Sequence, residues 1–355
     1  MIIVKILLFP FACLFGAVIG LRNKLFDWKI IPARSFHFPV IAVGNLSAGG
    51  TGKTPHIEHL IRLLKNHYKV AVLSRGYRRK TKGFILCRPE HSQLEIGDEP
   101  AQYLNKFPDI TLAVDEDRVR GIKRIMDERP ETEVILLDDA FQHRYVKPGR
   151  SILLTDYHHL YTEDYLLPVG LLREKSKGAK RADFIIVTKT PKVLSPITRR
   201  NLVKEIAPRP HQKLFYSYVS YDRPIPLKRC QNQKPAAEKY SYIIMVAGVA
   251  NSYPLQEYLK TICNELIIFD FHDHHQYSRS DFEKILNEYH SIISKDKVIF
   301  TTEKDATRLD TDEFSAYLDV LPVYYIPIRI NFHDCDEIKF DKLILDYVRK
   351  SIGSR

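Results

Sequence analysis

Strand-like and helix-like patterns alternate along the chain between about residues 38 and 190. Short apolar strands separated by helices predict a mostly parallel β-sheet with helices on both faces. The expected strands cover residues 40–43, 70–73, 84–87, 111–114, 134–137, 152–154 and 184–187, and the candidate helices cover residues 56–66, 99–106, 118–128 and 158–166.

The chain is long enough for two globular units, since 355 residues exceed one comfortable hydrophobic core. Residues 192–240 are rich in proline and basic residues, and they predict a connector with a strand at 214–219. From about residue 241 the alternation resumes, which predicts a second, smaller α/β domain. Its expected strands cover residues 242–247, 266–269, 298–301 and 323–328, and its helices cover 253–263 and 280–292. We therefore expect an N-terminal helix at 1–30, a first α/β domain at 31–195, a connector at 196–240 and a C-terminal domain at 241–355.

An uncharged apolar run of 16 residues, 6–21, follows Lys5 and precedes Arg22 and Lys24. As a helix it would be roughly 24 Å long at about 1.5 Å per residue, shorter than a bilayer core of about 30 Å. Pro10 would also disturb its first turns. A cleaved signal peptide and a buried core helix are alternatives, although no A-x-A-like cleavage site follows the run. We favour an anchor embedded in the membrane without a full crossing, its basic flanks on the cytoplasmic lipid surface.

Composition narrows the class of protein only a little. Apolar residues at 45% and charged residues at 27% describe an ordinary folded protein. The net charge of +11 suits nucleic acid, an anionic membrane or a phosphorylated substrate, and the number alone does not choose among them. The cysteines are scattered without a CxxC pair, which argues against a zinc site or a disulfide framework and fits a reducing compartment. They are Cys13, Cys87, Cys230, Cys263 and Cys335.

The segment SAGGTGKT at 47–54 follows an apolar run and precedes a helical pattern. Strand, glycine-rich loop and helix in this order form the context of a phosphate-binding loop, or P-loop. Its glycines would let backbone N–H groups approach an anion, Lys53 would reach the β- and γ-phosphates, and the Thr54 hydroxyl would bind Mg²⁺. Ser47 stands where the pattern asks for glycine, and a glycine-rich turn with an accidental Lys-Thr is the alternative. We expect a P-loop NTPase-like fold that binds a nucleoside triphosphate through Ser47, Ala48, Gly49, Gly50, Thr51, Gly52, Lys53 and Thr54.

Two carboxylates, Asp138 and Asp139, end the apolar run that begins after Glu133. A P-loop enzyme needs an acidic group at the carboxyl end of a neighbouring strand to hold Mg²⁺ directly or through water. A strand that runs into a solvated turn would give the same pattern, so the P-loop upstream decides in favour of Mg²⁺. Gln142 and His143 follow at once and bring polar groups to the same sheet edge.

Two further segments leave alternatives open. Asp98 in GDEP opens a helical stretch, and from spacing alone a plain helix cap is the preferred interpretation. The segment FHDHH at 271–275 carries three histidines, for which we favour a histidine that orients a catalytic carboxylate over a zinc site. The loop after Arg75 and Tyr77 is basic, and either a solvated loop or a contact with anionic lipid or phosphate explains it.

Taken together, these motifs resemble the tetraacyldisaccharide 4'-kinase family of lipid A biosynthesis. The resemblance covers nearly the whole chain, with VGNLSAGGTGKTP, LSRGY, GDEP, LLDDAFQH, LPVGLLRE, DHH and TEKDA in that order. It implies transfer of the γ-phosphate of ATP to the 4'-hydroxyl of a lipid-anchored disaccharide 1-phosphate. It also implies two α/β domains, joined by a short strand linker, that close around the site.

The resemblance also implies roles for individual residues. Asp98 matches the general base and His274 its partner, with the adjacent His275 as the alternative, which reverses the preference for a plain cap at Asp98. Lys53 would act on the transferring phosphoryl group, and Thr54, Asp138 and Asp139 would hold Mg²⁺. Ala140 stands where the usual motif has glycine. The expected substrate-binding residues are Arg75, Tyr77, Glu99, Arg118, Gln142, His143, Arg173 and Glu174.

The expected cofactors are ATP and Mg²⁺, and the expected partners are a lipid A disaccharide 1-phosphate precursor and an anionic membrane surface. We expect a monomer without a nucleic-acid partner, peripheral or monotopic at the cytoplasmic face of a bacterial inner membrane. The main alternative is a membrane-associated P-loop switch ATPase without a small-molecule acceptor. Such loops commonly carry a second lysine early, where this chain has Ala48 and Gly49. A nucleic-acid-binding ATPase rests on the basic charge alone.

Overall fold

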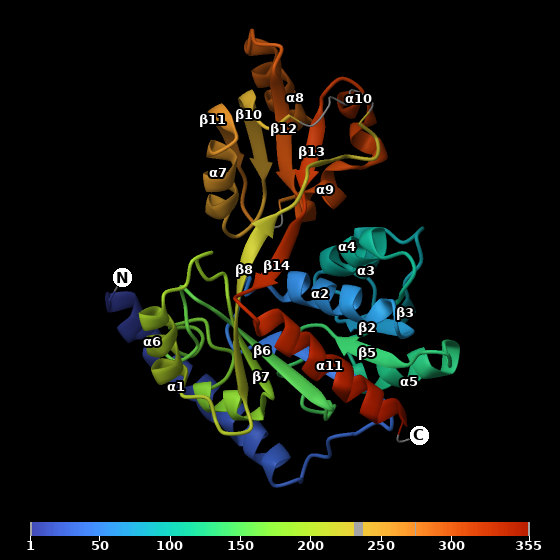
Figure 1. Ribbon diagram of the computed structural model, residues 1–355, viewed down its shortest axis with the longest axis vertical. Coiled ribbons are helices and arrows are strands. Elements are labelled where there is room, and N and C mark those ends of the chain that lie inside the picture. Colours follow the sequence, from blue (N-terminus) through green and yellow to red (C-terminus); the bar gives the residue numbers. More distant parts are fainter. Residues whose placement is uncertain (1, 231–236, 274, 354–355) are drawn as a thin grey trace. The chain divides into compact units, whose positions relative to one another are not determined.

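The computed structural model describes residues 2–230, 237–273 and 275–353, and it divides into two compact units (Figure 1). Unit 1 comprises residues 1–219 and 330–355, and unit 2 comprises residues 220–329. The chain leaves unit 1 through strand β8 (Lys213–Tyr221) and returns through strand β14 (Ile328–Phe332).

Unit 1 is built on a nine-stranded sheet in the order β14-β8-β7-β6-β1-β5-β2-β4-β3. From β8 to β4 every neighbouring pair is parallel, and β3 at the edge pairs antiparallel with β4. The expected α/β fold with a mostly parallel sheet is confirmed. The strands between the two edges are β1 (Val40–Asn45), β2 (Val70–Ser74), β4 (Thr111–Val114), β5 (Val134–Leu137), β6 (Arg150–Asp156) and β7 (Phe184–Thr188), and β3 is Ile85–Leu86.

Helices cover both faces of this sheet because successive strand residues point to opposite sides. In β1, Ile41 and Val43 join a core with helices α2, α4 and α11, whereas Val40 and Ala42 join a core with α5. The helices of unit 1 are α1 (Ile2–Asp27), α2 (Lys53–Lys65), α3 (Gln93–Ile96), α4 (Asp98–Lys106), α5 (Arg118–Glu128), η1 (Ser176–Arg181), α6 (Pro196–Ile206) and α11 (Asp336–Gly353).

The structure divides the chain differently from the boundaries that its composition suggested. Helix α11 lies within the expected C-terminal domain but packs on the sheet of unit 1, where Phe340, Ile344 and Val348 are buried. These residues recur every fourth position, so one face of the helix is apolar and needs a partner surface. Likewise α6 and most of β8, placed in the expected connector, belong to unit 1.

The prediction of a helix at residues 158–166 is wrong, because these residues form turns and isolated bridges. The Asp164 carboxylate accepts hydrogen bonds from the backbone N–H groups of Tyr165 and Leu171. Leu166 also forms a bridge with Leu172. A short polar side chain that bonds to nearby backbone amides offers the chain an alternative to helical bonding.

Unit 2 is a smaller α/β unit, as expected. Its five-stranded sheet has the order β11-β10-β12-β13-β9, parallel except for the β13–β9 pair. Helices pack on both faces, α7 against Met245 and Phe300 and α8 against Ile244 and Ile299. The elements are β9 (Ile225–Pro226), β10 (Tyr240–Ala247), α7 (Tyr253–Lys260), β11 (Cys263–Asp270), α8 (Arg279–Ser291), β12 (Lys297–Thr302), α9 (Glu303–Leu309), η2 (Asp312–Phe314), α10 (Ser315–Leu318) and β13 (Val323–Ile326).

Helix α1 is longer than the apolar run from which it was expected. It continues through Pro10 and spans 26 residues, and by length and composition it could cross a membrane. One side of the helix nevertheless contacts unit 1: the Lys5 ammonium lies 5.9 Å from the Tyr165 ring centroid, and a Cβ at Gly16 would clash with the Leu166 side chain. Apolar side chains on the rest of its surface are exposed, among them Leu7, Phe9, Phe11, Leu14, Val18 and Leu21.

Candidate functional site

The P-loop connects β1 to α2 at the carboxyl edge of the parallel sheet. Gly49 and Gly52 have φ values of 108° and 84°, in a region that disfavours residues with a Cβ atom. Asn45, the last residue of β1, donates from Nδ2 to the Thr51 hydroxyl at 2.9 Å. The glycines therefore determine the conformation of the loop, and the Asn45 amide links the end of β1 to Thr51 within it.

A second segment borders the P-loop and pairs with it. The Ala48 N–H donates to the Leu171 carbonyl at 2.6 Å, and the Arg173 N–H donates to the Leu46 carbonyl at 2.8 Å. On the other side, the Thr188 hydroxyl at the end of β7 donates to the Thr51 carbonyl at 3.0 Å. The LPVGLLRE motif thus supplies backbone support for the phosphate loop.

Lys53, Asp139 and Arg173 converge from three separate segments. The Lys53 Nζ lies 3.7 Å from Asp139 Oδ1, and an Arg173 Nη1 donates to both oxygens of the same carboxylate at 3.1 and 3.0 Å. Partial burial alone would raise the pKa of Asp139, but Lys53 and Arg173 hold it below its usual range. The site therefore keeps an ionised carboxylate beside the lysine of the phosphate loop.

Asp138 lies deeper and has a different electrostatic environment. Burial raises its pKa to about 6, and the carboxylates of Asp139 and Glu99 add to this effect against Lys53 and Arg118. The Ser74 hydroxyl at the end of β2 donates to Asp138 Oδ2 at 3.1 Å. The two adjacent carboxylates thus have pKa values shifted in opposite directions, which is a common property of functional sites.

The Arg118 side chain stabilises the turn that carries Asp138 and does not face solvent. Its guanidinium is buried and donates to the carbonyls of Asp138 at 2.9 Å and Asp115 at 2.7 Å. The backbone N–H of Arg118 donates to His143 Nε2 at 3.3 Å. Burial and the Arg118 charge lower the pKa of His143 to about 4, so this imidazole is neutral near pH 7.

The turn after β5 also explains how alanine replaces glycine in the DDAFQH motif. The residue with positive φ is Asp139, at 47°, and aspartate tolerates this conformation better than most residues. The Ala140 N–H donates to the Val43 carbonyl at 3.1 Å. Gly44 makes room for the next residue, since a Cβ there would lie 2.8 Å from the Phe141 backbone nitrogen.

Gln142 and Glu174 connect this turn to the end of helix α1. The Gln142 amide donates to the Asn45 carbonyl at 2.6 Å and to Glu174 Oε1 at 3.4 Å. Glu174 is buried and accepts two hydrogen bonds from Arg181, at 2.6 and 2.9 Å, and one from Asn23 of α1 at 2.9 Å. The apolar helix is thus anchored directly to the motif that borders the phosphate loop.

Asp98 and Glu99 begin helix α4 beside the loop that carries Arg75 and Tyr77. A Cβ at Gly97 would lie 3.0 Å from the Gly76 backbone, so the two loops are in close contact. The helix cap is Gly97 rather than Asp98, so the plain cap interpretation of Asp98 is wrong. Asp98 and Glu99 are half-buried, and the side chains of Arg75 and Tyr77 are exposed.

The predicted partner of Asp98 is His274, with the adjacent His275 as the alternative. His274 lies outside the described residues, and the pairing of Asp98 with His274 stays a prediction. His275, the alternative, belongs to unit 2, where its Nε2 lies 3.0 Å from Asp281 Oδ2 and its Nδ1 lies 3.3 Å from His272 Nδ1.

Four residues that shape the site were not among the site residues predicted from the sequence. Asn45, Ser74 and Thr188 are each the last residue of a parallel strand, and this position would have indicated them. His56 lies on the expected helix and gave no separate signal. Sequence patterns predict which residue types reach a sheet edge, but hydrogen bonds between strands distant in sequence require the fold.

The buried side chain of His56 stabilises the first turn of α2. It is buried, its Nδ1 lies 2.7 Å from the Gly52 carbonyl, and its Nε2 lies 3.0 Å from the Ser217 hydroxyl. Because a carbonyl only accepts, Nδ1 carries the hydrogen and the serine donates to Nε2. Burial lowers the pKa of His56 to about 4, which agrees with a neutral ring. His56 therefore joins the phosphate loop to strand β8.

The fold and this loop define a P-loop α/β protein with paired carboxylates at the neighbouring strand end. A family model described as tetraacyldisaccharide-1-P 4'-kinase matches residues 4–349. The chain is 45% identical to the tetraacyldisaccharide 4'-kinase of Phocaeicola vulgatus over 97% of this chain and 95% of that protein. It is also 45% identical to that of Flavobacterium johnsoniae, over 98% of each chain. The chain belongs to the tetraacyldisaccharide-1-P 4'-kinase family.

A solved structure agrees with this assignment. The crystal structure of LpxK from Aquifex aeolicus in complex with ATP is similar with a TM-score of 0.72 and 26% sequence identity, over 97% of this chain and 99% of that chain. The resemblance inferred from the motifs is confirmed, and so is the α/β fold class.

We expect the His56→Phe substitution to destabilise unit 1 by about 1–3 kcal/mol, because it removes the ring's hydrogen bond to the Gly52 carbonyl and leaves the buried Ser217 hydroxyl without its partner. Urea unfolding of the wild type and the variant would measure this change. Ser217→Ala should cost less, and the double variant should show coupling with His56→Phe. The exposed His67→Phe is the matched control, and equal effects of His56→Phe and His67→Phe would contradict the role of His56.

Proposed function

We propose that this protein is an ATP-dependent kinase that transfers the γ-phosphate to the 4'-hydroxyl of a tetraacyldisaccharide 1-phosphate lipid. The observation that carries the proposal is the convergence of Lys53, Asp139 and Arg173 at a P-loop in a chain of this family. In the reaction, the acceptor oxygen forms a bond to the γ-phosphorus while the bond to the β-phosphate oxygen breaks. The acceptor proton leaves with a base, and ADP is the leaving group.

ATP binding is supported by the geometry of the loop. The N-terminal end of α2 and the backbone N–H groups of the loop offer a positively polarised cradle for phosphate oxygens. Lys53, at the first position of α2, would neutralise charge on the β- and γ-phosphates. Arg173 also binds the Asp139 carboxylate and thereby adds a second cation to the same region.

A bound Mg²⁺ fits the residues proposed for it. Thr54, Asp138 and Asp139 offer a hydroxyl and carboxylates, the hard oxygen donors that Mg²⁺ prefers. The raised pKa of Asp138 beside a second carboxylate indicates a repulsion that a cation between them would relieve. When bound, Mg²⁺ would neutralise charge that develops on the transferring phosphoryl group.

Asp98 is the proposed general base. Its carboxylate is half-buried at the start of α4, next to the loop of Arg75 and Tyr77. It would accept the proton of the sugar hydroxyl, with His274 or His275 of unit 2 as the partner that orients it. Glu99 lies beside it and contributes to the negative charge around Asp138.

The remaining proposed substrate residues divide into two groups by their exposure. Arg118, Gln142, His143 and Glu174 bond to other parts of unit 1, so we assign them to the support of the site's substrate side. Arg75 and Tyr77 are exposed, and we assign them to contacts with the sugar or phosphate of a lipid headgroup. Beside His143 lies a hollow with a volume of about 660 Å³. It is lined by Pro32, Ala33, Arg34, Glu116, Asp117, Val119, His143 and Tyr145.

The lipid acceptor agrees with the position of α1, for which we propose monotopic insertion at the cytoplasmic face of the inner membrane. The helix contacts unit 1 from Lys5 to Asp27, where Asp27 pairs with Arg144 at 2.7 Å. A helix that packs lengthwise on a folded unit and exposes apolar side chains elsewhere suits the membrane interface better than a crossing. We propose that the protein acts there as a monomer and binds no nucleic acid.

The first expected result is that label from γ-labelled ATP appears in a disaccharide 1-phosphate lipid. Purified full-length protein in detergent micelles with Mg²⁺ is the sample, and extraction of labelled lipid is the measurement. Lys53→Ala should lower this transfer by orders of magnitude, because it removes a cation from the transferring phosphoryl group. Strong ATP hydrolysis that lipid does not change, without labelled lipid, would instead identify a switch ATPase.

We expect Asp98→Asn to lower kcat by about 10²–10⁴-fold, the usual contribution of a general base. The KM for ATP should stay nearly unchanged, because Asp98 is not part of the loop that holds the phosphates. Steady-state kinetics with varied ATP and lipid would separate the two constants. Asp109→Asn, an exposed carboxylate beyond the end of α4, is the matched control. A wild-type kcat in Asp98→Asn would rule out this base.

Membrane insertion of α1 predicts a large effect of charge on its exposed face. Leu14 is 65% exposed, and Leu14→Asp should lower the vesicle partition coefficient by at least about tenfold, since a carboxylate in the apolar region costs about 2.5 kcal/mol or more. Flotation with vesicles of anionic phospholipid is the measurement. Val193→Asp changes an even more exposed apolar residue away from α1 and should leave flotation unchanged. Equal flotation of both variants would argue against insertion through α1.

A further inference from the structure

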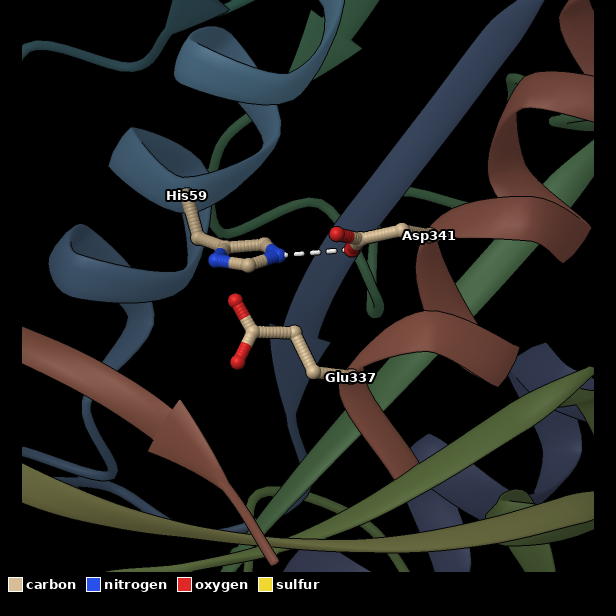
Figure 2. A group of neighbouring side chains, drawn as sticks. All are labelled: His59, Glu337 and Asp341. Atoms are coloured by element: carbon tan, nitrogen blue, oxygen red, sulfur yellow. Dashed lines mark hydrogen bonds and ion pairs between the residues drawn. The ribbon is translucent and has the colours of Figure 1, made fainter. Parts of the chain in front are cut away.

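Three metal-donor side chains meet between helices α2 and α11, away from the phosphate loop. His59 comes from the second turn of α2, and Glu337 and Asp341 come from the start of α11 (Figure 2). All three belong to unit 1 and are half-buried. Among the residues that the structure describes, this is where three such donors come together.

The geometry is close to that of a three-ligand metal site. One donor atom from each side chain lies within 4.8 Å of the others, and His59 Nε2 lies 2.8 Å from Asp341 Oδ1. Ligand atoms held about 2.0–2.2 Å from a common metal ion lie roughly 3–4 Å apart, so small side-chain rotations would complete the set. Glu337 and Asp341 are four residues apart, which places both carboxylates on one face of α11.

Packing also fixes the direction of the imidazole. The His59 ring packs against two phenyl rings that stack on each other, with centroid distances of 5.4 Å to Phe332 and 6.1 Å to Phe340. A ligand whose orientation is set by packing loses little freedom when it binds a metal ion. Figure 2 shows both carboxylates near this ring, with Asp341 at its Nε2 edge and Glu337 below it in the view.

Glu337 distinguishes a metal site from a simple contact between helices. The His59–Asp341 pair would join α2 to α11 without any third group. Glu337 makes no hydrogen bond or ion pair with any described residue, yet its carboxylate lies within reach of both partners. A negative charge in the first turn of a helix is favourable in any direction that keeps it near the N-terminus. That preference explains the presence of an acidic residue but not its approach to the imidazole.

We propose that His59, Glu337 and Asp341 bind one divalent cation of the Zn²⁺ class. One imidazole nitrogen and two carboxylates form a mixed nitrogen and oxygen set, which suits Zn²⁺ better than Mg²⁺, for which all-oxygen sites are usual. Water completes the coordination on the open side. The ion ties α11, at the end of the chain, to the helix that begins with Lys53 of the phosphate loop. This site is separate from the Mg²⁺ site proposed at Thr54, Asp138 and Asp139.

Isothermal titration calorimetry tests the proposal with metal-free, full-length protein in detergent and without nucleotide. Zn²⁺ should bind the wild type at a saturable site, and Mg²⁺ should bind there at least about tenfold more weakly. Glu337→Gln is the sharpest variant, because it removes a carboxylate that makes no hydrogen bond or ion pair with described residues, and thermal unfolding of the metal-free protein should stay unchanged. It should weaken Zn²⁺ binding at least about tenfold, since even supporting residues of metal sites contribute 10–100-fold.

His59→Gln should weaken Zn²⁺ binding in the same way, and both variants should lose the rise in Tm that Zn²⁺ gives the wild type. Asp346→Asn on α11 and His67→Gln after α2 change donors outside the group and are the matched controls. Absence of saturable Zn²⁺ binding would overturn the proposal. So would Zn²⁺ binding that Glu337→Gln and His59→Gln leave unchanged, which would reduce the group to the His59–Asp341 ion pair.

Discussion

Parallel pairing of β1 with β5 is the constraint on which the site depends. Val40 pairs with Ile135 and Ala42 with Leu137, so the two strands end at the same edge of the sheet. The phosphate loop follows one strand end and Asp138 and Asp139 follow the other, which brings Lys53 within 3.7 Å of Asp139. A slip of one residue in this register would exchange the side chains that β1 packs into the two cores on opposite faces of the sheet, so the packing that fixes the register also fixes the site.

The charges at this edge are arranged so that few are left without a partner. The Arg118 guanidinium donates to two backbone carbonyls, and Glu174 is neutralised by Arg181. Removal of one partner from such a buried pair leaves an uncompensated charge, which is far more costly than the pair itself is stabilising. Asp138 keeps a repulsion from the carboxylates of Asp139 and Glu99, which adds to burial in raising its pKa, and this is where we propose that Mg²⁺ binds.

Helix α2 connects the phosphate loop to parts of the chain far away in sequence. Its first residue is Lys53, His56 bonds to Ser217 of β8, and His59 bonds to Asp341 of α11. These positions recur every third residue, so they lie along one side of the helix. The C-terminal helix therefore stabilises the helix that presents the phosphate-binding lysine, although more than 280 residues separate His59 from Asp341 along the chain.

The sequence by itself determined the alternation of strands and helices, the P-loop, the two carboxylates after β5 and the family, because each is a local pattern in which neighbouring residues carry the signal. The strands at 111–114 and 134–137 and the helix at 118–128 have the expected bounds. The tertiary structure alone decided that α11 packs on the first sheet and that residues 158–166 form turns. It also decided the hydrogen bonds of the site: His56 and Thr188 bond to the phosphate loop, and Ser74 bonds to Asp138 across neighbouring strands. Periodicity records which face of an element is buried, but the partner of that face depends on contacts between segments far apart in the chain, which no local pattern specifies.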